Sequence, residues 1–448
     1  MISRRQFLQF LGALGVAPWA ANRTHAAEPL PWHNWSGYLK STPARRHTVK
    51  TESELSDILR AATGTVRPVG AGHSFSPLVP TDDDLLVIDD MQGLVAHDAI
   101  DKTAVLRAGT RLSVAGELLQ GIDQAMFNLP DIDRQTLAGA VATSTHGTGL
   151  ALGSLSAYVN YVRLVKPDGE VVEIDANQNA AWLPAAQVNL GALGVVTALG
   201  FQNRGKFNVR SQTWVEKTSE VMASFKEKVR QYEHYEFLPF VHCDYSLVIA
   251  HKEVSEAAGP IEPEGDAGPI FDTLAKVPVM LRKPLFNTMV QDLPPTDKIE
   301  PSHLALTNLR FDRFNEMEYS VPVDVGLECL AEVLHAIEAE GIDVVFPLEY
   351  REIAGDDTWL SMFAGGARAS ISIHRKAGED YHPYFDRIEP IFWKYGGRPH
   401  WGKVHSLGYK ELAELYPRFD DFVALQREFD PNGKMLNKHL RKLFNRSV

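Results

Sequence analysis

Two glycine-rich segments constrain this 448-residue chain more than any other part of its sequence. The first, Val66 to Pro77, reads VRPVGAGHSFSP, and the second, Gly139 to Gly149, reads GAVATSTHGTG. Small residues let a backbone lie close to a ligand, and hydroxyl and amide groups bind phosphate or ring edges. The first segment is neither a G-x-G-x-x-G fingerprint, because Phe75 stands at its third glycine position, nor a P-loop. Each segment alone is equally compatible with a tight turn that binds nothing.

The composition excludes several classes of protein. With 44% hydrophobic and 23% charged residues, the chain is long enough for two or three globular domains. Its net charge of −12, without a run of lysine or arginine, argues against nucleic acid or anionic lipid as a partner. Two cysteines, Cys243 and Cys329, exclude a disulfide framework, and whether they pair stays open. Because the histidines also lack H-x-x-x-H spacing, we expect no metal site.

The N-terminus has the pattern of an export signal. A twin arginine in SRRQFLQF precedes a short apolar stretch and small residues up to Ala26. This order is typical of a Tat signal peptide. The apolar run is shorter than the roughly 20 residues that a membrane-spanning helix needs, and glycine and proline interrupt it. We therefore expect residues 1–26 to be a Tat signal and the mature protein to be periplasmic or secreted.

The rest of the chain divides into two parts. From about residue 45 to 205, predicted helices and strands alternate with glycine turns, which indicates an α+β unit. Thr51 and Glu54 have the spacing of a capping box at the start of a helix. Pro167, Asp168 and Gly169, between two apolar runs, predict a hairpin. Beyond 205, residues 255–269 are rich in glycine, proline and acidic residues and predict an exposed loop.

Five segments follow one another along the chain, and the first two of them contain the two glycine-rich segments. They are VRPVGAGHSFSP, NLPDIDRQTLAGAVATSTHGTG, GALGVVTALGF, FPLEYREIAGDD and GRPHWGKVHS, and DPNGKMLNKHL follows them. Together they resemble the vanillyl-alcohol-oxidase type of flavoenzyme, in its sugar-1,4-lactone oxidase and alditol oxidase branch. The resemblance runs from residue 30 to the C-terminus and weakens between 205 and 300. It implies an α+β, two-domain flavoenzyme with a PCMH-type FAD-binding domain over 27–205 and a substrate domain over 206–448, whose C-terminal segment returns to the first domain.

The resemblance also implies which residues hold FAD. The first segment would surround the pyrophosphate and ring, and the histidine of its GxGHS loop is the one joined covalently to the flavin 8α-methyl carbon in this branch. A neutral imidazole is the nucleophile that such a bond requires. Non-covalent FAD, with the same ring stacked beside it, stays open. The implied cofactor-binding residues are Gly70, Ala71, Gly72, His73 and Ser74, then Thr143, Ser144, Thr145, His146, Gly147, Thr148 and Gly149, and on the adenine side Gly194 and Val195.

Four residues in the second half are candidates for the substrate side. Glu349 and Arg351 are two apart, so on a strand both project from one face. The alternation in ASISIHRK places His374 on the polar face of another strand. Such residues alone are more often a solvated face or a salt bridge. The resemblance implies that these three contact substrate hydroxyls, that Lys403 in HWGK stabilises reduced flavin, and that Thr136 occupies a position that is serine in alditol oxidases.

The resulting functional prediction is an FAD-dependent oxidoreductase that acts on a CH–OH group of a sugar derivative by hydride transfer to flavin N5. Arg351 would stabilise the developing alkoxide, His374 would assist removal of the hydroxyl proton, and Glu349 would hold the substrate and orient Arg351. An aldono-1,4-lactone is the first expectation for the substrate, and a polyol, as in an alditol oxidase, is the alternative. A non-catalytic exported sugar-binding protein and a histidine-rich metal protein are more distant alternatives. Oxygen, a quinone or a cytochrome remains open as the electron acceptor.

Overall fold

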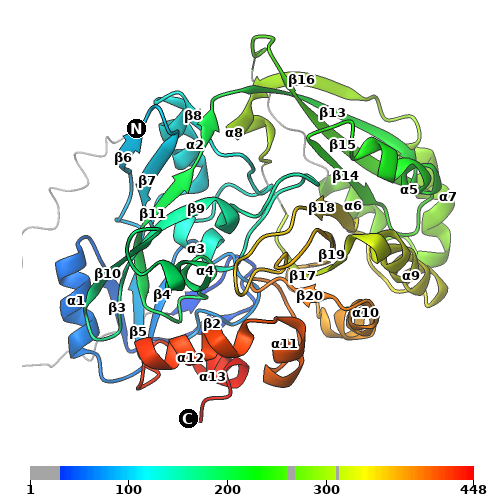
Figure 1. Cartoon of the computed structure of the whole chain (residues 1–448). Helices are drawn as coiled ribbons and strands as arrows, with labels where there is room; N and C mark the ends of the chain where they lie inside the picture. The colour runs from blue at the N-terminus through cyan, green and yellow to red at the C-terminus, as the bar shows by residue number, and fades with distance from the viewer. Residues whose placement is uncertain (1–30, 261–267, 309–311, 448) are drawn as a thin grey trace, which may run out of the picture.

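The computed structural model describes residues 31–260, 268–308 and 312–447. The predicted signal peptide, residues 1–26, lies outside the described residues, and so does the middle of the predicted loop 255–269. Two units built on separate sheets lie side by side, the first blue to green at the left of Figure 1 and the second green to orange at the right.

The first unit contains a parallel and an antiparallel sheet. The three-stranded parallel sheet has the order β3-β5-β4, and the five-stranded antiparallel sheet has the order β10-β9-β11-β7-β6. Two short pairs, β1–β2 and β12–β8, complete it. The strands are β1 (Trp32–His33), β2 (Lys40–Ser41), β3 (Arg45–Thr48), β4 (Val66–Val69), β5 (Asp84–Val87), β6 (Leu94–Asp98), β7 (Thr103–Arg107), β8 (Gln124–Ala125), β9 (Val159–Val165), β10 (Val171–Asp175), β11 (Val195–Gln202) and β12 (Arg204–Gly205).

The helices and turns of this unit follow their local sequence signals. Thr51 caps α1 by accepting a hydrogen bond from the Glu54 amide at 3.2 Å, and the Glu54 carboxylate accepts one from the Lys50 amide at 3.0 Å. The predicted hairpin is also confirmed, since β9 and β10 pair antiparallel across residues 166–170. The helices are α1 (Glu52–Ala61), α2 (Leu112–Gln120), α3 (Leu137–Ala142) and α4 (Leu183–Ala186), with 3-10 turns at Leu155–Tyr158 and Ala180–Trp182.

The second unit is an eight-stranded antiparallel sheet flanked by helices. Its order is β16-β13-β15-β14-β18-β19-β17-β20. Helices α9 and α10 pack against β17 and β19, and the opposite face of these strands is turned towards the first unit. The strands are β13 (Asn208–Lys217), β14 (His234–Pro239), β15 (Tyr245–Val254), β16 (Thr296–Pro301), β17 (Phe314–Pro322), β18 (Glu349–Ile353), β19 (Arg368–Lys376) and β20 (Arg398–Pro399).

The remaining helices cover this sheet or lie below the first unit. They are α5 (Thr218–Lys228), α6 (Gly268–Leu274), α7 (Val279–Val290), α8 (Ser302–Ala305), α9 (Gly326–Ala339), α10 (His382–Lys394), α11 (Tyr409–Leu415), α12 (Phe419–Phe429) and α13 (Lys438–Leu443), with a 3-10 turn at Val323–Val325. Helix α5 ends at Lys228, and β14 begins at His234 and pairs with β15 and β18.

The C-terminal segment returns to the first unit, and α12 and α13 lie below it at the bottom of Figure 1. The Val66 backbone amide donates to the Lys434 carbonyl at 2.8 Å. The side-chain amide of Asn437 donates to the backbone carbonyls of Pro77 and Pro80, each at 2.9 Å. The far end of the chain therefore anchors the first glycine-rich segment. We propose the domain boundary near residue 205, where the chain passes from β12 into β13.

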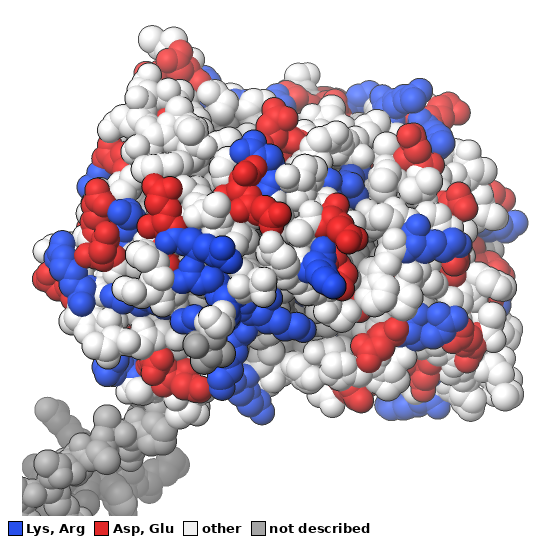
Figure 2. All heavy atoms as spheres, turned by 60° about the horizontal axis from the view of Figure 1, so that its bottom comes forward, with Lys and Arg blue, Asp and Glu red and all other residues white. Residues whose placement is uncertain are grey.

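Two global features complete the fold. Cys243 and Cys329 are free thiols, and Cys329 is buried in α9. Within the described ranges, no helix combines the length and apolar character needed to cross a bilayer. Basic side chains gather left of centre on the face in Figure 2, and acidic side chains border them.

Candidate active site

A large cavity lies between the first glycine-rich segment, α3, residues 189–196 and residues 400–403. It encloses about 930 Å³ of space, part of which is open to solvent. Eleven of the predicted cofactor or catalytic residues line it, namely Gly70, Ala71, Gly72, His73, Ser74, Thr136, Thr143, Thr145, Gly194, Val195 and Lys403.

The backbone of residues 70–74 forms the polar wall of this first cavity. Its N–H groups donate hydrogen bonds to no other described residue. Consecutive free amides of this kind bind anionic groups such as a pyrophosphate. Gly72 has φ +67°, in the left-handed region, and a β-carbon at Gly70 would overlap the Thr136 hydroxyl. The loop therefore needs glycine at both positions.

His73 stands at one end of the loop, inside the same cavity. Its ring stacks on Trp35, with the ring centroids 5.3 Å apart and the planes at 23°. Burial lowers the pKa of His73 to about 4, and the positive charges of Lys403 and Arg111 act in the same direction. The imidazole is therefore neutral at ordinary pH, with a lone pair on one nitrogen.

The first cavity fits FAD. Its free amides suit the pyrophosphate, and small or apolar side chains, among them Val69, Ile88, Ala138 and Ala142, suit a flat ring system. Buried Arg67 supports the wall by donating to the carbonyls of Leu78, Leu190 and Gly191.

A second, polar cavity of about 460 Å³ adjoins the first. Carboxylate, guanidinium, ammonium and imidazole groups from both units line it: Asp131, His146, Glu316, Glu318, Glu349, Arg351, His374, His400 and Lys403. Gln135, Thr145, His400 and Lys403 line both cavities. A molecule bound in the second cavity therefore meets the first at these four side chains.

Glu349 and Arg351 form an ion pair inside the second cavity, as the strand spacing predicts. The Arg351 Nη2 atom lies 2.9 Å from Glu349 Oε2, and both side chains are buried. Glu236 on β14 also lies near the Arg351 guanidinium, with its Oε2 4.0 Å from Arg351 Nε. Burial raises the pKa of Glu236 to about 7, with a further contribution from Glu349. Burial lowers the pKa of Arg351, but the nearby carboxylates raise it by more than burial lowers it, so the guanidinium is a permanent cation.

His374 and Lys403 converge on Glu316 of β17. The Lys403 ammonium is paired with Glu316 Oε2 and lies 4.0 Å from Glu318 Oε2. The His374 Nε2 atom lies 3.7 Å from Glu316 Oε1, and its Nδ1 lies 3.1 Å from the Pro347 carbonyl oxygen. Burial lowers the pKa of His374, although Glu316 and Glu349 oppose this shift.

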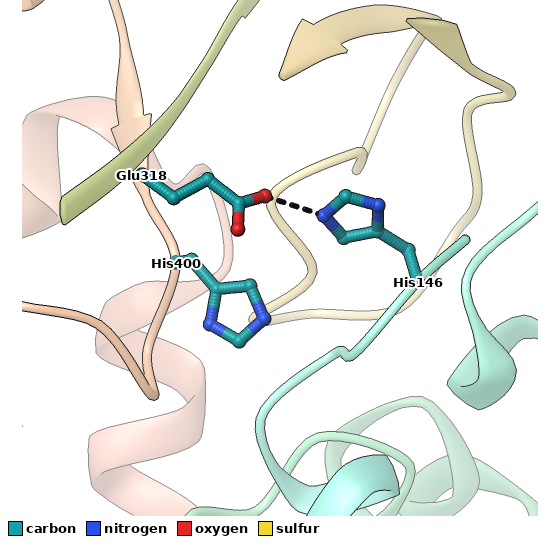
Figure 3. A group of neighbouring side chains, drawn as sticks. All are labelled: His146, Glu318 and His400. Carbon is teal, nitrogen blue, oxygen red and sulfur yellow. Dashed lines mark hydrogen bonds and ion pairs between the residues drawn. The ribbon is translucent and has the colours of Figure 1, made fainter. Parts of the chain in front are cut away.

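His146, Glu318 and His400 form a buried group at the edge of the second cavity (Figure 3). His146 Nε2 lies 2.6 Å from Glu318 Oε1, and its Nδ1 donates to the Gly147 carbonyl at 2.9 Å. Because a carbonyl only accepts, Nδ1 carries a proton, and the hydrogen bond between Nε2 and Glu318 Oε1 contains one further proton that belongs to the pair. Burial raises the pKa of Glu318, but His146, which is hydrogen-bonded to it, and the Lys403 ammonium hold that pKa well below its usual value.

Two histidines and a glutamate are also a ligand set for a metal ion. His400 Nδ1, however, accepts a hydrogen bond from the Gly402 amide at 2.9 Å, so in the neutral ring the proton sits on Nε2. The nitrogen left for a metal would have to lose that proton. The hydrogen bonds therefore favour a donor role for His400 over metal ligation.

The structure places several of the predicted cofactor-binding residues outside the first cavity. Ser144, His146, Gly147, Thr148 and Gly149 do not line the first cavity. After Thr145 the second glycine-rich segment turns away, because His146 pairs with Glu318, Thr148 donates to Glu236, and the Gly149 amide donates to the Glu352 carbonyl. This half of the segment joins the two units instead.

Thr136, which the resemblance placed among the catalytic candidates, lines the first cavity and not the second. Its hydroxyl caps α3 by accepting a hydrogen bond from the Gly139 amide. The physical reason is local: the residue before a short helix is the natural place for a hydroxyl cap. Thr136 thus shapes the wall under Gly70.

The sequence interpretation missed Gln135, Glu236, Glu316, Glu318, His400 and residues 189–191, all of which line a cavity. One signal was available. In FNEMEYSVP, Glu316, Glu318 and Ser320 alternate with apolar residues, which places two carboxylates on one face of a strand. Gln135, at the junction of both cavities, has a buried side-chain oxygen without a partner among the described residues.

Comparisons with known proteins agree with this geometry. The family model described as "D-arabinono-1,4-lactone oxidase" matches residues 199–443, and the one described as "FAD binding domain" matches residues 43–175. L-gulono-1,4-lactone dehydrogenase of Mycobacterium tuberculosis is 30% identical over 426 residues, covering 92% of this chain and 98% of that protein. Alditol oxidase of a Streptomyces species has the same identity and coverage. L-gulonolactone oxidase of Mus musculus is 27% identical over 437 residues, covering 94% and 99%.

Among solved structures, cholesterol oxidase of Brevibacterium sterolicum superposes with a TM-score of 0.77 at 17% identity, covering 96% of this chain and 100% of that one. The fold and the two cavities thus define an FAD-dependent oxidoreductase with a PCMH-type FAD-binding domain that acts on CH–OH groups. Within that class, the chain belongs to the D-arabinono-1,4-lactone oxidase family.

Proposed function

We propose that this protein oxidises a ring or chain hydroxyl of an aldono-1,4-lactone to a carbonyl. The observation that carries this proposal is the junction of the two cavities, where Gln135, Thr145, His400 and Lys403 line both. A hydroxyl-bearing carbon at this junction lies between the cofactor wall and a set of charged hydrogen-bonding groups. FAD, when bound, supplies the oxidant that accepts a hydride at N5.

The protein's own groups position the substrate and take its proton. Arg351 is a fixed cation that donates to the reacting oxygen and stabilises negative charge as it develops. Glu349 orients Arg351 through their 2.9 Å ion pair and accepts from a neighbouring substrate hydroxyl. His374 is neutral and accepts the hydroxyl proton at a ring nitrogen. Lys403, at the junction, places positive charge beside the cofactor.

The charges of the second cavity favour a neutral substrate. Glu316, Glu318 and Glu349 line it against Arg351 and Lys403, and the carboxylates are already paired with these cations or with His146. The carboxylate of an open aldonic acid would add a negative charge without a free cation to meet it. A lactone and a polyol both avoid this cost. The alditol oxidase relative at 30% identity therefore keeps a polyol as the second candidate.

Three finer features belong to the same proposal. The neutral ring of His73 inside the first cavity supports a covalent bond to the flavin. The twin-arginine segment supports export through the Tat machinery to the periplasm or the outside. Oxygen, a quinone or a cytochrome would then reoxidise the enzyme.

A spectrum and a substrate panel test the proposal. Purified protein should absorb in the blue, and acid precipitation should leave the colour in the pellet. Matched aldono-1,4-lactones, their open aldonates and alditols would then be compared with oxygen and with a dye as acceptor. Turnover of lactones but not of aldonates is expected. A colourless protein from riboflavin-replete cells, or turnover of none of these compounds, would contradict the proposal.

A further inference from the structure

Glu316 connects two groups that the proposed reaction uses separately. It lies on β17 directly opposite His374 of β19, and its backbone carbonyl accepts a hydrogen bond from the Val404 amide at 2.9 Å. Its side chain is 4% exposed. Oε2 is paired with the Lys403 ammonium, whereas Oε1 lies 3.7 Å from His374 Nε2. The two carboxylate oxygens therefore face two different functional groups.

The hydrogen bond of His374 determines which of its nitrogens is basic. Nδ1 lies 3.1 Å from the Pro347 carbonyl oxygen, which can only accept, so Nδ1 carries the proton of the neutral ring. Nε2 then has the lone pair and faces Glu316 Oε1. At 3.7 Å this is no hydrogen bond. Once Nε2 gains a proton, the same contact becomes an ion pair between imidazolium and carboxylate.

The charged neighbours of His374 come from three elements. Glu316 on β17 and Glu349 on β18 favour the protonated ring, Lys403 in the loop after β20 disfavours it, and the Pro347 carbonyl holds Nδ1–H. The Phe314 ring covers His374 edge-on, with centroids 5.0 Å apart. Glu349 is already held by Arg351, and Glu318 by His146 and Ser370. Glu316 is thus the carboxylate with an oxygen left for His374.

We propose that Glu316 is a positioning residue that makes His374 Nε2 the acceptor of the substrate's hydroxyl proton and holds Lys403 at the junction of the cavities. This inference rests on the proposed function. In the reaction, the substrate O–H bond breaks and an Nε2–H bond forms, while the hydride of the C–H bond goes to the FAD of the first cavity. Glu316 stays ionised throughout, with Oε2 paired to Lys403 and Oε1 facing the new imidazolium.

Glu316→Gln tests the inference through the pH profile of kcat/KM. Activity of the wild type should fall as pH decreases and His374 becomes protonated. Without the Glu316 charge, protonation is less favourable, so this acidic limb moves to lower pH. Because the weaker base removes a proton more slowly, kcat should fall about 10- to 100-fold while KM changes less than about threefold. Glu316→Asp, which keeps the charge, should return the limb towards the wild-type position.

Glu352→Gln is the matched control. Glu352 is a buried carboxylate of β18 that lies on the face opposite Glu349 and Arg351 and contacts Tyr350. Its replacement should leave the acidic limb in place. An acidic limb that does not move in Glu316→Gln, or that moves equally in Glu352→Gln, would overturn the inference.

A readout without turnover separates this inference from the proposed function. Protein labelled with 15N-histidine, with the resonance assigned by His374→Gln, should show a proton on Nδ1 and a protonation midpoint that Glu316→Gln moves to lower pH. If no sugar derivative is oxidised but the midpoint moves, the proposed function fails and the coupling of Glu316 to His374 stands. If the midpoint is the same in both proteins, the coupling fails. Glu316→Ala, which also removes the charge, serves for the same titration should the glutamine variant not fold.

Discussion

Gly70 lies directly against Thr136, so that a β-carbon at residue 70 would overlap the hydroxyl oxygen of Thr136. The first glycine-rich segment and the start of α3 are therefore one continuous wall of the first cavity. The free amides of residues 70–74 are held in place by this contact and by the C-terminal segment under β4.

Gly70→Ala should reduce FAD content and stability together. The added methyl group must push the loop or Thr136 aside, and such overpacking costs about 1–3 kcal/mol of unfolding free energy. Flavin absorbance per protein and thermal unfolding measure both effects. Gly205→Ala is the control, because nothing lies within 4 Å of a β-carbon there. Equal flavin content in both variants would contradict the close contact.

His73→Ala should remove the covalent bond to flavin and retain bound FAD. The five free amides and the apolar lining remain, whereas the imidazole that stacks on Trp35 is lost. Acid precipitation should then release the yellow colour into the supernatant. His97→Ala, on the exposed strand β6, should leave the colour in the pellet. Colour that stays in the His73→Ala pellet would place the bond elsewhere.

Arg351→Met should lower kcat/KM by about 10²- to 10³-fold, since a donor to the reacting oxygen is lost. It also leaves Glu349 and Glu236 buried without their shared cation, so binding of neutral substrates should weaken as pH rises and Glu236 ionises. Steady-state kinetics between pH 6 and pH 9, a window chosen around the Glu236 pKa of about 7, measure this. Arg210→Met, which breaks an exposed pair with Asp297, should leave kcat/KM unchanged. An Arg351→Met enzyme with wild-type kcat would refute the role.

The buried carboxyl group of Glu352 should make the free energy of unfolding depend on pH. Burial raises the pKa of its carboxyl group to about 7, well above the ordinary 4.5. The folded protein therefore binds the Glu352 proton more tightly than the unfolded chain does. The protonated carboxyl group contributes fully to the free energy of unfolding below pH 4.5, and this contribution is lost as pH rises through 7. Glu352→Gln should consequently gain in thermal stability relative to the wild type on going from pH 5 to pH 8. A difference that is constant across this range would show that the carboxyl is not perturbed.

Substrate charge gives a further prediction. Because the second cavity has no cation that is free of a carboxylate partner among the described residues, an aldono-1,4-lactone should have a much higher kcat/KM than its ring-opened aldonate. The comparison needs fresh lactone and its hydrolysed form at one pH. A preference for the aldonate would mean that Arg351 or Lys403 exchanges its partner on binding.

The sequence alone determined the features that depend on neighbouring residues. The capped start of α1, the hairpin between β9 and β10 and the glycine loop before His73 follow from short-range signals, because turns and caps depend on residues a few positions apart. The shared face of Glu349 and Arg351 follows from strand alternation in the same way.

Only the tertiary structure decided how distant segments meet. Glu318 contacts His146 across 172 residues of sequence, and Glu316 contacts Lys403 across 87. These contacts turn the second half of the GAVATSTHGTG segment towards the substrate side and bring the E-x-E pair of β17 into the second cavity. Local propensity carries no information about which carboxylate will neutralise which cation. The pairing is fixed only when the two sheets pack together, because a buried charge must then pair with a charge that the packing brings next to it.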